Sequence, residues 1–332
     1  MEHDGAIDDL LSQMLVLTME DVEMIGVNVS PADCFIEPAI ESTYKILQLF
    51  GRTDIPIGRS DFHGVNAFPG EWRARPEVVN ALPLLININY ELDPYALPEA
   101  TDLLIENLSA AQQPVTILIT GPCSNVVRAI KKKPSIREKI EEFVWMGGAF
   151  RTQGNVQTYQ HNGTAEWNVY WDPPRAKALF EMELPLTCIP LDVTNNVPVN
   201  KAFLSRLAQQ SDSLLSNLAG QFWAMTIDTI PSYHYVYFMW DTLATCYLAL
   251  SQHFTLEEVT AVVSDRPPNA GQTILDENGH PLKMWIRRFS MNTFWRNLKR
   301  TSSEHDYGQF RTLLNPKPLL RGLIIKKDES PH

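Results

Sequence analysis

The sequence has few cysteines, a shortage of positive charge and no long apolar run, and each shortage excludes a class of protein. Its four cysteines, Cys34, Cys123, Cys188 and Cys246, are scattered without CxxC spacing, so we expect reduced, buried thiols in a cytoplasmic protein rather than a disulfide framework or zinc site. Lys and Arg number 28 against 39 Asp and Glu, a net charge of -11 that argues against nucleic-acid or anionic-membrane partners. Uncharged stretches such as TIPSYHYVYFMW are too short and too polar to span a bilayer.

The 332 residues are 44% hydrophobic and 20% charged, which allows a sizeable core. Short apolar runs rich in β-branched residues alternate with helical patterns. Strands are predicted at 22–29, 115–120, 143–148 and 186–192, and helices at 36–50, 97–109, 124–131, 173–181 and 201–220. This alternation predicts an α/β fold with an open, mostly parallel, Rossmann-like sheet covered by helices.

Polar residues follow several of these strands directly. They fall at Ser30 to Asp33, Thr120 to Asn125, Gly147 to Asn155, and Asp192 to Asn196. In open α/β sheets the carboxyl ends of the strands form the ligand crevice. We therefore expect the functional site at this edge of the sheet.

Three aspartates, Asp4, Asp8 and Asp9, stand in the N-terminal stretch EHDGAIDDL, just before the helix-like run LLSQMLVL. One interpretation is helix capping, because carboxylates suit the orphan N–H groups and the positive dipole end of a helix. Asp4 fits that less well, since it lies one glycine away. Several carboxylates at one turn repel each other unless a cation or protons intervene, and a hard divalent ion is the natural partner.

Other motifs each allow two interpretations. TGPCSN, from Thr120, is either a ligand-presenting loop or a Gly-Pro turn with a Ser cap, and WDTLATCYLAL places Asp241 either as a helix N-cap or as a metal ligand beside the stacking ring of Trp240. FPGEWR and NGTAEWN carry aromatic, Glu and Asn side chains that fit either turns or nucleoside recognition. No HExxH or GxSxG motif is present, which removes zinc hydrolysis and serine-nucleophile schemes as leading hypotheses.

Taken together, HDGAIDDL, SPADCF, FPGEWR, TGPCSN, MGGA, GNVQTYQHNGTAEWNVYWDP and WDTL closely resemble, in order and spacing, the nucleoside hydrolases. More narrowly they are similar to the purine-specific, inosine-adenosine-guanosine-preferring branch. The likeness covers roughly residues 2 to 300 and implies the nucleoside hydrolase fold.

The resemblance implies one Ca²⁺ bound by Asp4, Asp9, Asp241 and the main-chain carbonyl of Thr120, with ribose hydroxyls and water completing its shell. Oxygen-only ligation is what calcium favours. It also makes Asp4 the general base that activates water for attack on the anomeric carbon, past a transition state with oxocarbenium character. Asp8 then supports the turn or binds the sugar hydroxyls.

Further positions match by motif the residues that hold the substrate: Asn155, Glu166 and Asn168 at the ribose, with Glu71 joining them. Trp72 and Trp240 would sandwich a purine, and Asp33 would lie near the base. In less selective relatives a histidine precedes the metal-binding aspartate, whereas Trp240 stands here, so a histidine acid is excluded at this place. The resemblance thus implies a purine ribonucleosidase of purine salvage, and a homodimer.

Two departures from the family pattern bear on activity. Glu2 replaces the first aspartate and Ala6 a polar side chain near the ribose, and Met1 lies only three residues from Asp4, so the first strand is expected to be truncated and Asp4 to be poorly anchored. The alternative function is therefore a non-catalytic nucleoside-binding protein. A Mg²⁺-dependent phosphatase is disfavoured because Glu2 stands where its nucleophilic aspartate is needed. We expect one hydrolase domain over 1–300 and a C-terminal extension of irregular structure over 301–332.

Overall fold

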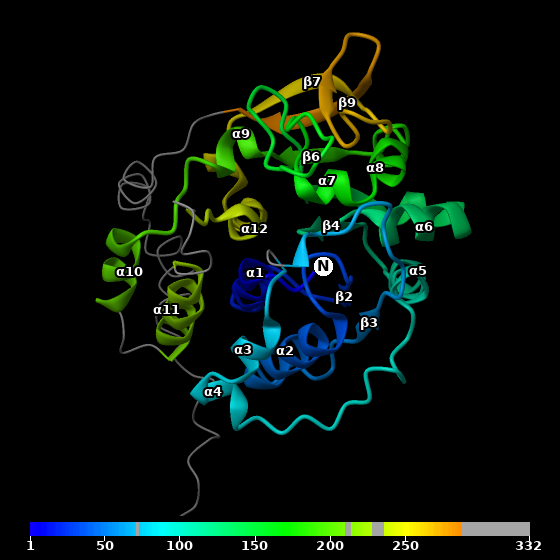
Figure 1. Ribbon diagram of the computed structural model, residues 1–332. Helices are drawn as coiled ribbons and strands as arrows, with labels where there is room; N and C mark the ends of the chain where they lie inside the picture. The colour runs from blue at the N-terminus through cyan, green and yellow to red at the C-terminus, as the bar shows by residue number, and fades with distance from the viewer. Residues whose placement is uncertain (71–72, 210–213, 228–235, 287–332) are drawn as a thin grey trace, which may run out of the picture.

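The computed structural model describes residues 1–70, 73–209, 214–227 and 236–286. Within them, one nine-stranded sheet has the order β3-β2-β1-β4-β5-β6-β9-β7-β8 (Figure 1). Every neighbouring pair from β3 to β9 is parallel, and β7 pairs antiparallel with β9 and β8. The strands are β1 (Glu2–His3), β2 (Val27–Val29), β3 (Ile57–Arg59), β4 (Val115–Ile119), β5 (Ile140–Met146), β6 (Leu186–Ile189), β7 (Leu256–Val263), β8 (Thr273–Leu275) and β9 (His280–Trp285). The predicted open, mostly parallel α/β fold is confirmed.

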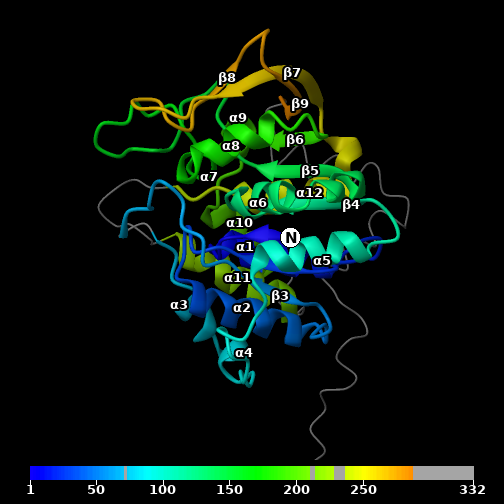
Figure 2. The ribbon, with the colours of Figure 1, turned by 90° about the vertical axis from the view of Figure 1, so that its right-hand side faces the viewer.

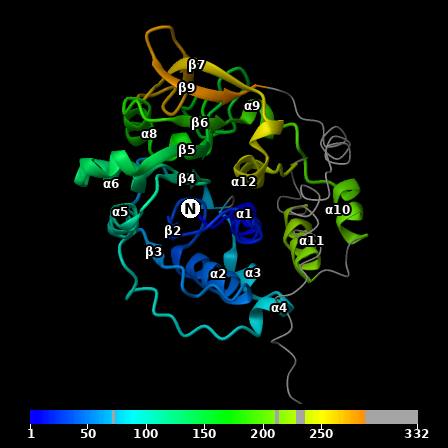
Figure 3. The same cartoon turned by 180° about the vertical axis from the view of Figure 1, so that it is seen from behind.

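Helices cover both faces of this sheet. The longer ones are α1 (Ile7–Leu17), α2 (Ile36–Leu49), α5 (Ala100–Ala110), α6 (Ser124–Lys132), α8 (Pro173–Phe180), α10 (Lys201–Ala208), α11 (Leu214–Thr226) and α12 (Trp240–Leu250). The shorter ones are α3 (Pro76–Asn80), α4 (Pro83–Ile86), α7 (Trp167–Trp171) and α9 (Leu191–Thr194). Figure 2 shows α5, α6 and α8 on the viewer's side of the sheet, and Figure 3 shows α10 and α11 outside α1 and α12.

The first strand is short, yet it lies in the middle of the sheet. Glu2 is in register with Asn28 of β2 on one side and with Ile119 of β4 on the other. The Met1 ammonium donates to the Gly26 carbonyl (3.0 Å), and the Glu2 carbonyl accepts from Thr120 N (2.8 Å). The expectation of a poorly anchored Asp4 is wrong, because the two residues before it are bonded to both neighbouring strands.

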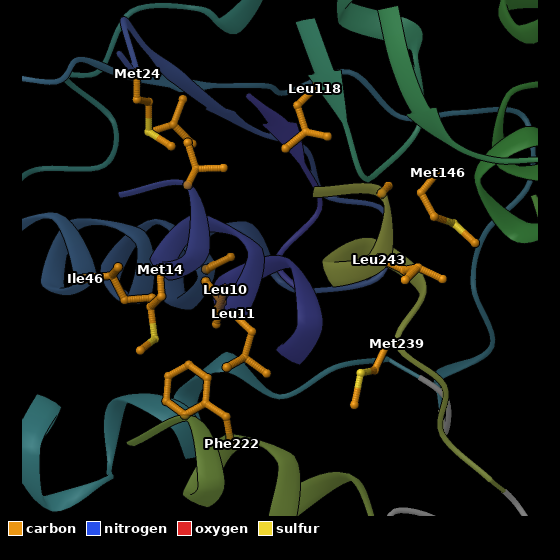
Figure 4. Close-up of a cluster of buried hydrophobic side chains, with 14 of the residues drawn as sticks. Leu10, Leu11, Met14, Met24, Ile46, Leu118, Met146, Phe222, Met239 and Leu243 are labelled. Carbon is orange, nitrogen blue, oxygen red and sulfur yellow. The ribbon is translucent and has the colours of Figure 1, made fainter. Parts of the chain in front are cut away.

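The larger apolar cluster packs α1, α2, α11 and α12 against one face of the sheet. Figure 4 shows Leu10, Leu11 and Met14 of α1 facing Phe222 of α11, with Leu243 of α12 nearby. Leu10 is fully buried although it directly follows Asp9. The core therefore anchors the helix whose first turn carries Asp8 and Asp9.

The predicted helices at 36–50, 97–109, 124–131 and 173–181 are confirmed within a few residues as α2, α5, α6 and α8. The region 201–220 was predicted as one helix, but its described parts form two, α10 and α11. The antiparallel strands β7 to β9 were not predicted. The C-terminal extension 301–332 lies outside the described residues. None of the described helices has the length and apolar character needed to cross a membrane.

Candidate active site

Five aspartates from four separate segments gather beyond the carboxyl ends of the central strands. Asp4 follows β1, Asp33 follows β2, Asp8 and Asp9 lie in the first turn of α1, and Asp241 lies in the first turn of α12. Asp4, Asp8, Asp9 and Asp241 are all at most 5% exposed. The family resemblance implied that Asp4, Asp9 and Asp241 meet, and the polar residues after the strands placed Asp33 at the same edge of the sheet.

Asp4 contacts the loop that follows β2. Its Oδ2 accepts from the Asp33 N–H (3.2 Å). Burial raises the pKa of Asp4 well above its ordinary value, and the adjacent Asp9 carboxylate raises it further. A carboxylate in this position is poised to take a proton, because its neighbours make the charged form costly.

Asp9 has two roles in one side chain. Its Oδ2 accepts from the Ala6 N–H (2.9 Å) at the start of α1, which confirms a capping contribution. Its Oδ1 is buried and has no hydrogen-bond partner among the described residues. A buried carboxylate oxygen without a donor is costly, so capping alone does not account for Asp9.

Asp8 joins α1 to α12. Its Oδ2 accepts from the Asp241 N–H (3.1 Å), and its Oδ1 accepts from the Tyr237 hydroxyl. Burial and the Asp9 charge raise the pKa of Asp8 to about 6. The interpretation of Asp241 as the N-cap of its helix is wrong: Met239 holds that position and Asp8 supplies the carboxylate from another helix. Burial and the Asp8 charge raise the pKa of Asp241 well above its usual value.

Asp33 lies between the cluster and the loop that precedes α3. Its main-chain carbonyl accepts from Ala74 N (2.8 Å), and its Oδ1 is buried without a partner in the part of the chain that the structure describes. Burial and the charge of Asp9 raise the pKa of Asp33 to about 8. The Arg73 guanidinium donates to the carbonyls of Pro31 and Cys34 and so joins the same two loops.

Thr120 is 1% exposed at the end of β4, where its N–H and hydroxyl both bond to the Glu2 carbonyl. Its own carbonyl accepts from Asn168 Nδ2 (2.9 Å). The predicted Ser cap of the following helix is wrong, because Cys123 holds the N-cap position and the Ser124 hydroxyl donates to Asp172 instead.

The predicted ribose-holding residues form a second layer beside Thr120. Asn168 Nδ2 also donates to the Met146 carbonyl (3.1 Å). Glu166 caps α7 by accepting from Asn168 N and Val169 N, and burial raises its pKa to about 7. Asn155 Oδ1 accepts from Trp167 N (3.1 Å). These bonds order the loop, and contact of its side chains with ribose stays a prediction.

Trp240 lies directly before Asp241 and is half-buried. Its indole N–H donates to Asn195 Oδ1 (3.1 Å), and its ring meets that of Tyr237 edge-on at 4.7 Å. Glu71 and Trp72 lie outside the described residues, so the second wall of the predicted purine sandwich stays a prediction.

The family model of the inosine-uridine preferring nucleoside hydrolases matches residues 1–301 of this chain. The chain belongs to this family. An inosine-uridine preferring nucleoside hydrolase from Bacillus anthracis, known as a crystal structure, is 33% identical with a TM-score of 0.81, over 90% of this chain and 96% of that one. The expected nucleoside hydrolase fold and the hydrolysis of ribonucleosides are thus confirmed.

The relatives differ in the base that their names specify. The pyrimidine-specific ribonucleoside hydrolase RihA of Klebsiella pneumoniae (strain 342) is 28% identical over 242 residues, 70% of each chain. A purine-preferring ribonucleoside hydrolase from Gardnerella vaginalis is 20% identical with a TM-score of 0.69, covering 95% of this chain and 98% of that one, which supports the fold alone. Family membership therefore does not determine the base preference of this nucleoside hydrolase, which depends on the residues of its own site.

The chemistry of this nucleoside hydrolase's cluster fits a hard cation. The buried Oδ1 atoms of Asp9 and Asp33 have no donors from the described segments, and closely spaced carboxylates without a cation must stay partly protonated. Among the described residues, no three His, Cys, Asp or Glu side chains form a ready-made metal site. A cation would therefore need the Thr120 carbonyl as a ligand in addition to the aspartates.

Sequence reasoning missed three groups in this nucleoside hydrolase's site. Asn195 falls in the polar stretch Asp192 to Asn196 that was expected at this edge, and Tyr237 is one of several aromatic residues before Trp240, but the sequence assigned neither of them a contact. Glu2 was expected only as a departure, yet its buried carboxylate accepts from Asn28 Nδ2 (2.6 Å) and Asn125 Nδ2 (3.1 Å) and fastens β1 beneath Asp4.

Proposed function

We propose that this nucleoside hydrolase cleaves the N-glycosidic bond of purine ribonucleosides, releasing ribose and free base for purine salvage, with one Ca²⁺ in the aspartate cluster. The observation that carries the proposal is the convergence of Asp4, Asp8, Asp9 and Asp241, all buried, from three segments of the chain. Mutual repulsion among buried carboxylates lowers the stability of the fold, and such a cost is typical of a functional site.

Asp4, Asp9, Asp241 and the Thr120 carbonyl would hold the cation. When bound, it supplies positive charge that makes a water molecule more acidic and favours binding of a sugar diol. Asp4 takes the proton of the attacking water as its general base. Asp8 and the Asn155, Glu166 and Asn168 side chains orient the ribose, and the negative charge of the cluster stabilises positive charge developing on the sugar.

The purine preference rests on Trp240. An indole beside Asp241 offers a broad stacking surface to a bicyclic base, and stacking is worth about 1 to 3 kcal/mol. With Trp72 on the other face and Asp33 near the ring nitrogens, a purine would be held on both sides.

A pyrimidine-specific hydrolase is the second candidate, because the RihA relative with that name is 28% identical to this chain over 242 residues. The test is release of base from inosine, guanosine, adenosine, uridine and cytidine by calcium-loaded protein. The purine proposal predicts a higher kcat/KM for the purine nucleosides. A preference for uridine or cytidine would replace it with the pyrimidine candidate.

Two further expectations belong to this proposal: the protein is a homodimer, and it acts in the cytoplasm. All four cysteines are unpaired, as expected for a reducing compartment. Light scattering of the purified full chain would give the oligomeric state, and a mass of one chain would reject the dimer.

A further inference from the structure

Residues 197–199 and 237–239, which lie far apart in the sequence, are joined by backbone hydrogen bonds beside the aspartate cluster. Met239 N donates to the Val197 carbonyl (3.0 Å), and Val199 N donates to the Tyr237 carbonyl (2.8 Å). Pro198 and Phe238 form an antiparallel bridge between them. This short ladder fixes the register in which Asn195 meets Trp240.

Trp240 is held in two directions. Asn195 Oδ1 accepts its indole N–H at 3.1 Å, which fixes the rotation of the ring. The Tyr237 ring packs edge-on at 4.7 Å with an interplanar angle of 60°. A stacking wall gains affinity when it is fixed before the ligand arrives, because no side-chain entropy is then lost on binding.

Tyr237 also reaches the other side of the site. Its hydroxyl donates to Asp8 Oδ1, while the Asp241 N–H binds Oδ2 of the same carboxylate. One phenol therefore contacts both the ring expected at the base and the carboxylate expected at the ribose. Its hydroxyl fixes the rotamer of Asp8 and leaves the remaining lone pairs of the carboxylate for a sugar hydroxyl.

We propose that Asn195 and Tyr237 are positioning residues. Asn195 sets the angle of the Trp240 ring and thereby the base selectivity. Tyr237 holds the Asp8 carboxylate in position for the ribose and links it to the Trp240 ring. The proposal rests on the proposed function, which places Trp240 at the base and Asp8 at the ribose. It predicts that the two residues act on different parts of the substrate.

The Asn195 part is tested by the ratio of kcat/KM for inosine to that for uridine. Asn195→Ala removes the acceptor for the indole, so the ratio should fall about threefold to tenfold, the usual effect of one hydrogen bond. Asn195→Asp keeps an acceptor oxygen for the indole and should restore the ratio. Its added charge should change kcat/KM for both substrates alike and therefore leave the ratio unaffected. Asn196→Ala is the matched control, because the bonds of Asn196 Nδ2 within residues 1–70, 73–209, 214–227 and 236–286 go to main-chain carbonyls of its own turn.

The Tyr237 part is tested with free D-ribose as inhibitor. Tyr237→Phe keeps the ring against Trp240 but removes the donor to Asp8. The inhibition constant of ribose and the KM of both nucleosides should rise together, by about tenfold, because the lost bond is to a charged group. Tyr247→Phe is the control, since Tyr247 lies in the same helix as Trp240 but its ring packs edge-on against Phe254.

An unchanged inosine-to-uridine ratio in Asn195→Ala, or an unchanged ribose constant in folded Tyr237→Phe, would overturn the proposal. The Tyr237→Phe arm decides on its own if Asn195→Ala does not fold. Calorimetric titration of wild type and variants with inosine and ribose separates this inference from the proposed function. Binding that weakens in the variants without base release from wild type would reject the function and keep the inference, whereas no binding of either ligand would overturn the inference.

Discussion

Asp4 is a buried carboxylate whose surroundings favour its protonated form. It is 3% exposed, Asp33 N–H is its one main-chain donor among the described residues, and burial raises its pKa. The side chain adds little to the fold's stability, because an amide could accept the same bond from Asp33. A structural function for Asp4 is therefore weak, and a catalytic one strong.

Asp4→Asn should lower kcat for inosine by at least about a hundredfold, since general-base catalysis contributes that much or more. Thermal unfolding should show a folded protein, because removing a buried, repelled charge does not leave a cavity. Asp172→Asn is the control, since it neutralises a buried carboxylate bonded to Ser124, away from the cluster. Equal rates in wild type and Asp4→Asn would reject the base assignment.

Trp240→Ala should lower kcat/KM for inosine roughly fivefold to a hundredfold, because it removes about 1 to 3 kcal/mol of stacking energy. Uridine, with a smaller ring, should lose less, and Trp240→Phe should recover part of the inosine loss. Steady-state kinetics with both substrates measures this. An equal loss for inosine and uridine would show that the ring does not contact the base.

At the scale of the element, the turn between β1 and α1 brings the first aspartates together. Gly5 has a φ of +79°, and its N–H donates to His3 Nδ1 (3.1 Å). A Cβ at this position would lie 2.4 Å from Cys34 Sγ and 2.6 Å from Ala39 Cβ. The turn can hold Asp4 beside Asp9 only because glycine has no side chain.

Gly5→Ala should therefore cost more stability than Gly51→Ala, and it should also lower activity. Gly51 has a φ of +67° with nothing within 4 Å of its added Cβ, so its substitution costs only the backbone strain of about 1 to 2 kcal/mol. Urea unfolding of both variants gives the comparison. Equal losses would mean that contact with Cys34 does not constrain the turn.

Helix α1 is anchored by its apolar face. Leu10→Ala should destabilise the protein by about 2 to 5 kcal/mol, because Leu10 is fully buried and its truncation leaves a cavity. Leu275→Ala, at a position 36% exposed, should change the free energy of unfolding by less than about 0.5 kcal/mol. Urea unfolding again measures both, and a loss at Leu10 as small as that at Leu275 would contradict the packing described here.

The sequence was informative where local patterns decide the structure. Helices such as α2 and α6 show an apolar period, and Asp4, Asp9 and Asp241 stand in recognisable motifs. It failed where distant segments decide: Asp241 is capped by Asp8 from another helix, and Tyr237 meets Asp8 across 229 residues. The anchoring of strand β1 was not predicted, because two residues carry no periodicity, although β1 pairs with both β2 and β4.

At the scale of the whole molecule, a bound cation would link catalysis to stability. The cluster joins β1, β2, α1 and α12, so an ion that relieves repulsion among its carboxylates stabilises the native state alone. Calcium at about a hundred times its dissociation constant should raise the free energy of unfolding by about 2.7 kcal/mol. Thermal unfolding with and without calcium measures this, with Asp9→Asn as the variant expected to lose most of the shift.

The most direct test is release of hypoxanthine from inosine by protein stripped with a chelator and then titrated with Ca²⁺. The account predicts negligible release from the stripped protein, recovery to the full rate on adding calcium, and no recovery in Asp4→Asn. Full activity in excess chelator, or none at any calcium concentration from a folded protein, would contradict it.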